Sequence, residues 1–238
     1  MHIGLLVNDL SGGGAEKALV LYASYLSADA GHEVTVYTLE SGEQVYELPP
    51  NVPRKVLTSG MLNRGAARIA SLPIQAAELA ARFRRDDVDV GFSFLQRANA
   101  VHALSRRFGN TAKIALSEQN FAKDMYPADK LSGRVMRAII TRTYPRADRV
   151  VATSVGVKAG LEELGVPGHM IQIAHNPVQV PSKGSREPRS LGTRPPFITT
   201  VGRLIDLKDH PTLIRAFAIV RRTRPAKLQI VGAGPNEE

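Results

Sequence analysis

The first 40 residues contain the pattern that most restricts the fold of this chain: a strand, a helix and a second strand in direct succession. The apolar run at 2–8 (HIGLLVN) predicts a buried strand, and 15–28 has the apolar spacing of a helix. Gly31 is the residue type that commonly ends a helix, and 33–39 (EVTVYTL) predicts the next strand. A helix between two such strands is typical of parallel pairing, so we expect an α/β protein.

The same alternation of apolar runs and helical periods continues along the chain. We expect further strands at 88–94, 113–117, 149–154, 171–175, 197–202 and 227–231. We expect further helices at 65–85, 97–108, 133–141, 155–164 and 211–223. The strand runs are short and rich in β-branched residues without regular polar alternation, which is typical of parallel strands covered on both faces.

One stretch interrupts this pattern. Residues 177–196 contain five prolines and no apolar period, which predicts a linker. The strand–helix–strand pattern starts again at Phe197. We therefore expect a Rossmann-like domain at 1–176, a linker at 177–196 and the opening of a second, incomplete Rossmann-like domain at 197–238.

Composition excludes several classes of function. The chain has no cysteine, so it has no disulfide, no thiolate metal centre and no cysteine nucleophile. The histidines show no metal-ligand spacing, and we expect no metal site; they are His2, His32, His102, His169, His175 and His210. No apolar stretch approaches the roughly 20 residues of a membrane span, and the N-terminus lacks a basic secretory leader. We therefore expect a cytoplasmic protein.

The net charge of +9 is unevenly placed, with 16 basic and 8 acidic residues between 61 and 149. Such an excess indicates either an acidic partner or a solubilising surface. No nucleic-acid motif or aromatic stacking cluster is present, so we expect no nucleic-acid partner. Residues 130–149 interleave basic side chains with Val135, Met136, Ile139 and Ile140. This segment predicts either a helix that adsorbs to anionic membranes or an ordinary half-buried helix.

Three glycines, Gly12, Gly13 and Gly14, separate the first predicted strand from the first helix. Glycines allow a ligand to approach the backbone closely, and a helix N-terminus attracts anions. We expect a phosphate or sugar here; the alternative is a plain flexible turn. The dinucleotide fingerprint fails because Lys17 stands where its third glycine belongs, and no phosphate-loop motif follows. We therefore interpret Glu40, after the second strand, as a surface residue.

The segment 117–120 (SEQN) ends a predicted strand, at the sheet edge where ligands bind in open parallel sheets. Glu118 is a candidate acid, base or acceptor of a sugar hydroxyl, and Asn120 is a candidate substrate ligand. The alternative is a cap or loop hydrogen bond. His175, at another strand end, is interpreted as a turn or core residue.

In the second domain, 201–209 (VGRLIDLKD) follows the first strand and precedes a helix. Arg203 and Lys208 there suit a diphosphate, Arg as a fork and Lys as a point charge. The alternative is a pair of solvated charges near Asp206 and Asp209. The glycines of 231–235 (VGAGP) suit a turn at the same end of the sheet.

Together these motifs resemble the retaining GT-B-fold glycosyltransferases of family 4, also called glycosyl transferases group 1. The resemblance covers essentially the whole chain and follows the family's order. It is carried by GGGAEKALVLYASYL and GHEVTVYTL, by DVDVGFSFLQRAN and ALSEQN, by RADRVVATSVGVKAGL and IAHNPV, and by FITTVGRLIDLKDHPTLIRAFAIV and LQIVGAGP. The last pair is the most specific. SFLQRAN and SEQN are similar to members that extend undecaprenyl-linked or cell-surface saccharides.

The resemblance implies transfer of a hexosyl or N-acetylhexosaminyl group from a UDP-sugar or other nucleotide-sugar to a saccharide or polyprenyl-linked acceptor. It implies a role in cell-surface polysaccharide biosynthesis. Peripheral attachment at the inner face of the membrane is expected from the basic segment 130–149 instead. Gly13 and Gly14 would contact the donor phosphate or sugar. Arg203 and Lys208 would neutralise the diphosphate leaving group without a metal or other cofactor.

Three departures from the family pattern matter. Gln119 stands near the place of a common acceptor-side histidine, so Glu118 and Asn120 are only candidate acceptor-side residues and no catalytic residue is assigned. Ala233 replaces an acidic residue between the glycines. The family's glutamate pair lies beyond Gly234, and neither Glu237 nor Glu238 corresponds to it. The alternative function is a non-catalytic, truncated acceptor- or membrane-binding module that needs a separate C-terminal half.

Overall fold

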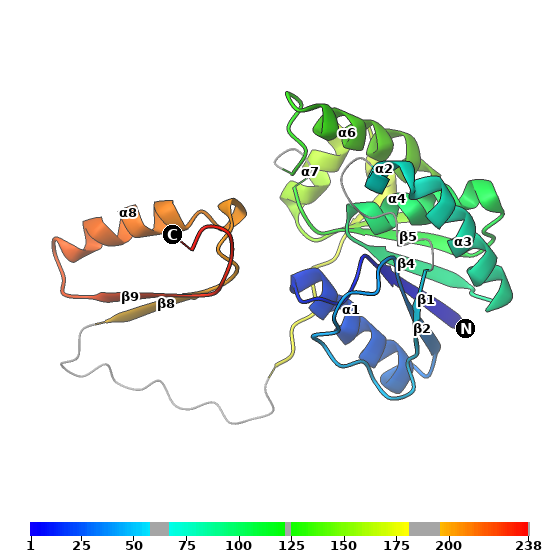
Figure 1. The fold of residues 1–238 in the computed structure, drawn as a ribbon, viewed down its shortest axis with the longest axis horizontal. Helices are drawn as coiled ribbons and strands as arrows, with labels where there is room; N and C mark the ends of the chain where they lie inside the picture. Colours follow the sequence, from blue (N-terminus) through cyan, green and yellow to red (C-terminus); the bar gives the residue numbers. More distant parts are fainter. Residues whose placement is uncertain (58–66, 122–124, 181–195, 238) are drawn as a thin grey trace. The chain divides into compact units, whose positions relative to one another are not determined.

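The structure, a computed structural model, describes residues 1–57, 67–121, 125–180 and 196–237. The chain divides into two compact units, Met1–Val180 and Pro181–Glu238 (Figure 1). Most of the predicted linker, residues 181–195, lies outside the described residues, so the prediction of a linker at 177–196 stays a prediction.

The first unit contains a seven-stranded, wholly parallel sheet with strand order β3-β2-β1-β4-β5-β6-β7. Its strands are β1 (His2–Val7), β2 (Glu33–Thr38), β3 (Arg54–Val56), β4 (Val90–Phe94), β5 (Lys113–Glu118), β6 (Arg149–Ala152) and β7 (Ile171–Ile173). Leu5 of β1 pairs with Val36 on one side and Phe92 on the other, which places β1 inside the sheet. The expected Rossmann-like α/β architecture is confirmed for this unit.

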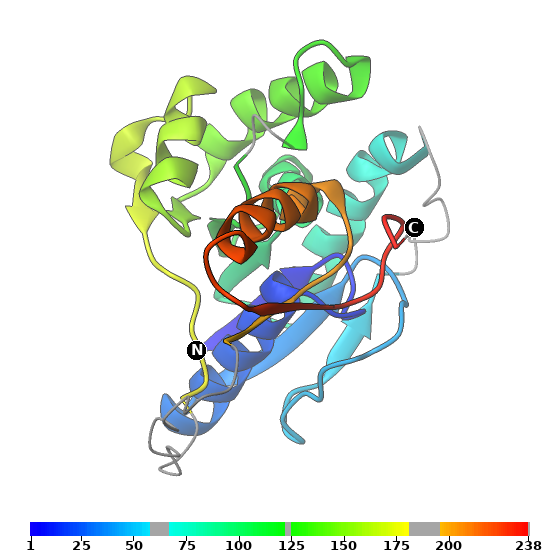
Figure 2. The same cartoon turned by 90° about the vertical axis from the view of Figure 1, so that its left-hand side faces the viewer.

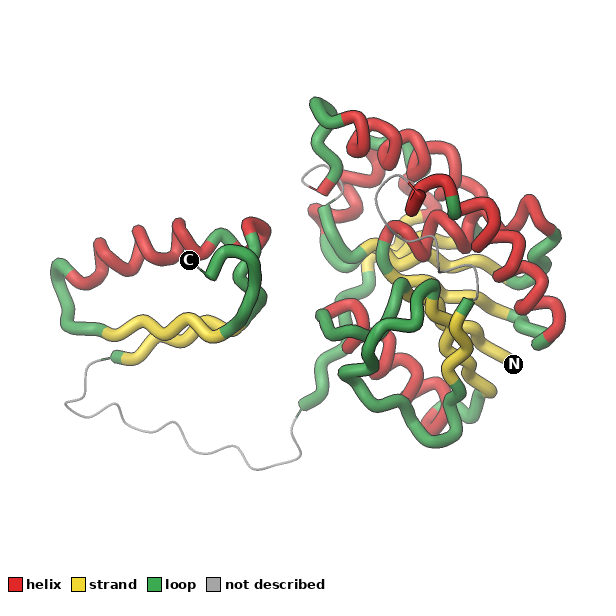
Figure 3. Tube along the Cα trace, in the orientation of Figure 1, coloured by secondary structure: helices red, strands yellow, loops and turns green. Residues whose placement is uncertain are grey.

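Helices cover both faces of this sheet (Figure 3). They are α1 (Gly14–Ser24, continued by a π-turn at Tyr25–Asp29), α2 (Ala67–Ala70), α3 (Leu72–Arg85), α4 (Gln96–Ser105), α6 (Leu131–Thr143) and α7 (Val155–Glu163). Single 3₁₀ turns follow at Arg106–Phe108, Tyr144–Arg146 and Gly168–Met170. Gly31, with φ +64°, stands where the chain leaves the first helix, in a left-handed conformation that glycine adopts without strain.

Alternate residues of β1 show how the core is built. Leu5 and Val7 belong to a buried cluster with Leu19 of α1, whereas Leu6 belongs to a separate cluster with Phe83 of α3. Successive side chains of a strand point to opposite faces, so one apolar run serves both layers. This explains why the strand sequences lack polar alternation.

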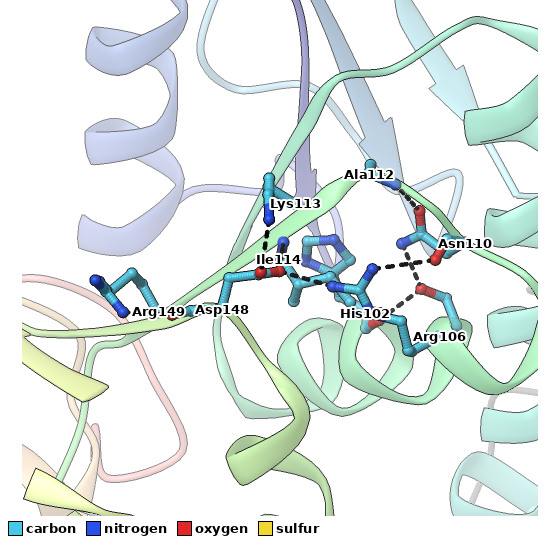
Figure 4. A network of polar contacts seen from close by, with 9 residues as sticks. His102, Arg106, Asn110, Ala112, Lys113, Ile114, Asp148 and Arg149 are labelled. Carbon is cyan, nitrogen blue, oxygen red and sulfur yellow. Dashed lines mark hydrogen bonds and ion pairs between the residues drawn. The ribbon is translucent and has the colours of Figure 1, made fainter. Parts of the chain in front are cut away.

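A polar network connects the 3₁₀ turn after α4 with the amino ends of β5 and β6 (Figure 4). Asp148 accepts hydrogen bonds from Arg106 Nη2 at 2.7 Å, from the Ile114 N–H at 2.9 Å and from Lys113 Nζ at 3.3 Å. Burial by itself would raise the pKa of Asp148, but these three donors outweigh it and hold that pKa below its usual value. The network is structural and lies at the edge opposite to the candidate site.

In the second unit the structure describes β8 (Phe197–Val201), a 3₁₀ turn at Asp206–Lys208, α8 (His210–Arg221) and β9 (Lys227–Val231). The strands pair in parallel from Phe197–Lys227 to Val201–Val231, and α8 runs along one face of the pair (Figure 2). Asp209 caps α8 by accepting a hydrogen bond from the Thr212 N–H at 3.3 Å. Within residues 196–237 no residue is fully buried.

The predicted strands and helices correspond to observed elements, with bounds that differ by a few residues. The prediction missed β3, a three-residue strand at the edge of the sheet. In the part of the chain that the structure describes, no helix is both long and apolar enough to cross a membrane. The same residues contain no cluster of side chains arranged to hold a metal ion.

Candidate functional site

The strand order locates the natural ligand site of the first unit. The chain moves outward from β1 to β2 and β3, then returns to β4 on the other side of β1. The carboxyl ends of β1 and β4 therefore form a topological switch point, where ligands bind in open parallel sheets. The glycine loop follows β1, and Leu95 follows β4 at this same edge.

The glycine loop brings the N-terminus of α1 to this edge. Gly12 has φ +104°, and Gly13 is the N-cap of α1 without a side chain to satisfy the first-turn N–H groups. A Cβ added to Gly14 would meet no atom within 4 Å. The space beside Gly14 is therefore open, as its predicted phosphate or sugar contact requires. The Glu16 carboxylate of the first turn lies over Gly13 instead, so the predicted donor contact of Gly13 stays a prediction.

The loop after β4 contains a backbone strain that the sequence did not signal. Leu95 adopts φ +73°, which is rare and costly for a bulky residue, and α4 starts directly after it. Such conformations cluster at functional sites. After this turn, Gln96 donates a hydrogen bond to Glu118 at the end of β5, and Arg97 pairs with a carboxylate after β2.

Arg97 forms an ion pair with Glu40 across the carboxyl end of β1. Its guanidinium also donates to Gln75 Oε1 at 3.3 Å, and only 9% of its side chain is exposed. The interpretation of Glu40 as a surface residue is therefore wrong, because this carboxylate is 23% exposed and bound to a buried cation. The ion pair thus connects the segments after β2 and β4 at the carboxyl edge of the sheet, where the glycine loop also begins.

Glu118, at the end of β5, is fully buried. Its Oε1 accepts from Gln96 Nε2 at 2.5 Å and from the N–H groups of Gln119 at 3.1 Å and Asn120 at 3.3 Å. Its Oε2 accepts from the Tyr144 hydroxyl at 2.8 Å. Burial raises the pKa of Glu118 to about 7, although the hydrogen bonds from Tyr144 and the two N–H groups act against this rise.

This geometry changes the role of Glu118. With no exposed surface, its carboxylate does not reach an acceptor from this position, and it instead holds the backbone of the loop that contains Asn120. The alternative interpretation, a loop hydrogen bond, describes it better. Asn120 is half-buried on that loop, and its contact with a substrate stays a prediction.

Side chains above Glu118 connect the loops after β5, β6 and β7. Asn176 Nδ2 donates to Gln119 Oε1 at 2.7 Å, and Gln119 Nε2 donates to Ser117 Oγ at 2.6 Å. His175 is exposed in the loop after β7, and its Nδ1 lies 2.8 Å from the Thr153 carbonyl oxygen, so it is not a core residue. These contacts form a partly buried polar layer beside the Glu118 carboxylate.

In the second unit, Arg203 and Lys208 follow β8 and are both exposed. The structure shows no ion pair between either cation and a described residue, and the Lys208 side chain passes within 3.7 Å of the Cβ position of Gly202. A Cβ at Gly232 would overlap the Gly202 carbonyl oxygen, and one at Gly234 would overlap that of Leu204. The glycines of GAGP thus allow the turn after β9 to pack directly on the loop that holds Arg203.

A match to a known protein family identifies the class of protein to which these loops belong. The sequence pattern of the family described as Glycosyltransferase Family 4 matches residues 12–180, from the glycine loop to the end of the first unit. The chain belongs to glycosyltransferase family 4. Its seven-stranded unit is thus the part on which this family membership rests.

The relatives of this family 4 chain are glycosyltransferases and proteins of the same fold. The chain is 27% identical over 237 residues to the N-acetylgalactosamine-N,N'-diacetylbacillosaminyl-diphospho-undecaprenol 4-alpha-N-acetylgalactosaminyltransferase of Campylobacter jejuni. That alignment covers 98% of this chain and 62% of the relative. This chain thus spans about 62% of the length of the curated relatives that it matches.

Solved structures confirm the fold. Sucrose-phosphate synthase from Thermosynechococcus elongatus aligns with a TM-score of 0.72 and 20% identity, over 97% of this chain and 62% of that protein. Anabaena HepE, solved with UDP-glucose, aligns with a TM-score of 0.64 and 19% identity, over 98% of this chain and 61% of that protein. At this identity the likeness supports the Rossmann-like architecture alone.

Proposed function

We propose that this family 4 chain acts in the transfer of a hexosyl or N-acetylhexosaminyl group from a nucleotide-sugar to a saccharide or polyprenyl-linked acceptor. The observation that carries this proposal is the match over 98% of the chain to an enzyme named for a diphospho-undecaprenol acceptor. The open space beside Gly14 and the exposed Arg203 and Lys208 support it. The product would belong to cell-surface glycan synthesis.

The role proposed for Arg203 and Lys208 depends on the negative charge that forms on the donor diphosphate. Breaking the bond between the sugar and a nucleoside diphosphate leaves negative charge on the diphosphate, and fixed cations stabilise that charge most in the transition state. Arg203 supplies a bidentate fork and Lys208 a point charge. Two side-chain cations can fill the role of a metal ion, so we expect the activity to persist in a chelator such as EDTA.

On the acceptor side, the buried Glu118 carboxylate fixes the loop and Asn120 offers an amide to a sugar hydroxyl. Glu118 is then a positioning residue that acts through the N–H groups of Gln119 and Asn120. We assign no catalytic residue. The proposed location is cytoplasmic, with peripheral attachment at the inner face of the membrane, where a polyprenyl-linked acceptor would be available.

Titration of the purified chain with UDP-sugars by calorimetry, together with a turnover assay on a polyprenyl-linked saccharide, tests this function. We expect donor binding and sugar transfer, both unchanged by EDTA. The second candidate is a non-catalytic acceptor- or membrane-binding module that needs a separate C-terminal half. It predicts neither tight donor binding nor sugar transfer by this chain alone. Absence of donor binding and of transfer would therefore contradict the first candidate and favour the second, whereas tight donor binding with turnover would contradict the second.

Gly14→Ala tests the glycine loop separately from stability. The added methyl enters open space at the first turn of α1, so we expect the unfolding free energy to stay unchanged or to rise by up to about 1 kcal/mol. Donor affinity or turnover should fall by about tenfold, because the methyl occupies the space proposed for the ligand. Chemical denaturation and the transfer assay measure the two effects. Unchanged turnover would remove this loop from the site.

A further inference from the structure

The first unit contains a pocket that the proposed transfer does not use. It lies between the end of α4 and the helix α6 and has a volume of about 340 Å³, near the lower end of small-ligand pockets. Its floor is apolar and is formed by Leu104, Val135, Ala138 and Ile139.

Three arginines and Thr143 complete the lining of this pocket. Arg107, Arg142 and Arg146 are exposed, and no acidic residue lies among the lining residues. In the described part of the chain none of the three forms an ion pair, and Arg142 donates to the Ala138 carbonyl oxygen at 3.4 Å. That contact directs the Arg142 guanidinium back along α6 toward the pocket floor. The combination of an apolar floor and cations on the rim suits an amphiphile with an anionic head.

The structure argues against simple adsorption of α6 to a membrane. Ile140 is fully buried, Met136 packs against the core, and Val135 and Ile139 line the pocket. The apolar side chains of α6 therefore form no continuous exposed stripe of the kind that an adsorbing helix needs. The interpretation of α6 as a half-buried helix agrees with this packing.

We propose that the α4–α6 pocket binds a single anionic membrane lipid, with an acyl chain on the apolar floor and the phosphate among the three arginines. The local charge supports a lipid of this class, because the arginines lack acidic partners and the segment 61–149 has a net excess of basic residues. The proposal deepens the membrane attachment proposed above and does not depend on sugar transfer.

The pocket is separate from the proposed acceptor site. Leu104 and Arg107 belong to the end of α4, and the chain enters β5 at Lys113 shortly after them. The pocket thus lies toward the amino ends of β5 and β6, whereas Glu118 marks the carboxyl end of β5. The lipid in this pocket would serve as an anchor rather than as the sugar acceptor.

Sedimentation with lipid vesicles tests this site. The full chain is mixed with vesicles of phosphatidylcholine alone or of an equal mixture with phosphatidylglycerol, and the bound fraction is measured. We expect binding to the mixed vesicles only. Ala138→Phe fills the pocket and should weaken binding about tenfold. Its control, Ala81→Phe, adds the same ring at an exposed position of α3 and should bind as the unmodified chain does.

Two sets of charge variants keep the test decisive if Ala138→Phe unfolds the chain. The pocket set replaces three exposed arginines: Arg107→Gln, Arg142→Gln and Arg146→Gln. The control set removes the same charge from the second unit: Arg215→Gln, Arg222→Gln and Arg224→Gln. We expect the pocket set to lose at least about tenfold in binding and the control set to lose little. Equal losses in both sets, stronger binding of Ala138→Phe or equal sedimentation with neutral vesicles would overturn the proposal.

Discussion

Replacing Glu118 by alanine is expected to lower the unfolding free energy by about 2–5 kcal/mol, among the largest effects of any single change in the first unit. The substitution removes the acceptor for the Tyr144 hydroxyl and the Gln96 amide, which donate to the carboxylate at 2.8 Å and 2.5 Å. Both donors are buried, and a buried donor without a partner costs free energy. Urea denaturation with circular dichroism measures the effect.

Glu162→Ala is the matched control for this experiment. Glu162 is exposed on α7, and its contact with Lys158 is a long ion pair of 3.9 Å. We expect a change within about 0.5 kcal/mol, as for most exposed ion pairs. A similar, small loss in both variants would show that the Glu118 network contributes little to the fold.

Glu118→Gln separates the charge of Glu118 from its hydrogen bonds. Burial raises the pKa of Glu118 to about 7 from 4.5. Between these two pH values the folded chain keeps a proton that the unfolded chain releases, so this group lowers stability as the pH rises. The side-chain amide of the variant does not titrate. Between pH 4.5 and pH 7.5 the unfolding free energy of Glu118→Gln should therefore rise, relative to that of the unmodified chain, by up to about 3 kcal/mol. Parallel stability curves across this range would contradict the raised pKa.

Replacing Arg203 by alanine is expected to lower donor affinity or turnover by about 100-fold, the size usual for loss of one fixed donor to a developing anion. Arg203→Lys should recover only part of this, because an ammonium lacks the planar fork that binds two phosphate oxygens. Lys208→Ala should cost about tenfold, since it removes a single point charge. The calorimetric titration and the transfer assay described above measure these losses.

Arg222→Ala controls for the general charge of the second unit. Arg222 follows α8 and is exposed, so its loss should change donor affinity little beyond a weak, salt-dependent effect. Arg203 and Lys208 are themselves exposed, and their replacement should leave the unfolding free energy nearly unchanged. Equal losses for Arg203→Ala and Arg222→Ala would exclude a diphosphate site at Arg203.

The sheet was predictable because its strands are buried on both faces. Such strands are continuous apolar runs, and β1, β2 and β4 are visible in the sequence for that reason. The strand β3 was not, because its sequence is Arg-Lys-Val at the edge of the sheet, where burial imposes no apolar run. Parallel pairing also allowed the loops after β1 and β5 to be placed at one edge.

The interior of the candidate site was less predictable. A carboxylate after a strand normally lies at the surface, and the local sequence around Glu118 gives no sign of the Tyr144 hydroxyl that covers it from 26 residues away. The ion pair of Arg97 and Glu40 likewise joins residues 57 positions apart. The φ of +73° at Leu95 has no signal at all, since leucine is not a residue that favours it.

The absence of fully buried residues from 196–237 has a consequence for the kinetics and affinity of ligand binding. A segment with so little burial opens locally at low free-energy cost, so the amide hydrogens of β8 and β9 should exchange with deuterium much faster than those of β1. A ligand held by Arg203 then binds only those molecules in which residues 196–237 are folded. Its apparent dissociation constant is therefore larger than the intrinsic one, in inverse proportion to the folded fraction. A contact that stabilises the folded form of β8 and β9 would slow the exchange of these amides. The same contact would lower the apparent dissociation constant even if it does not involve the ligand.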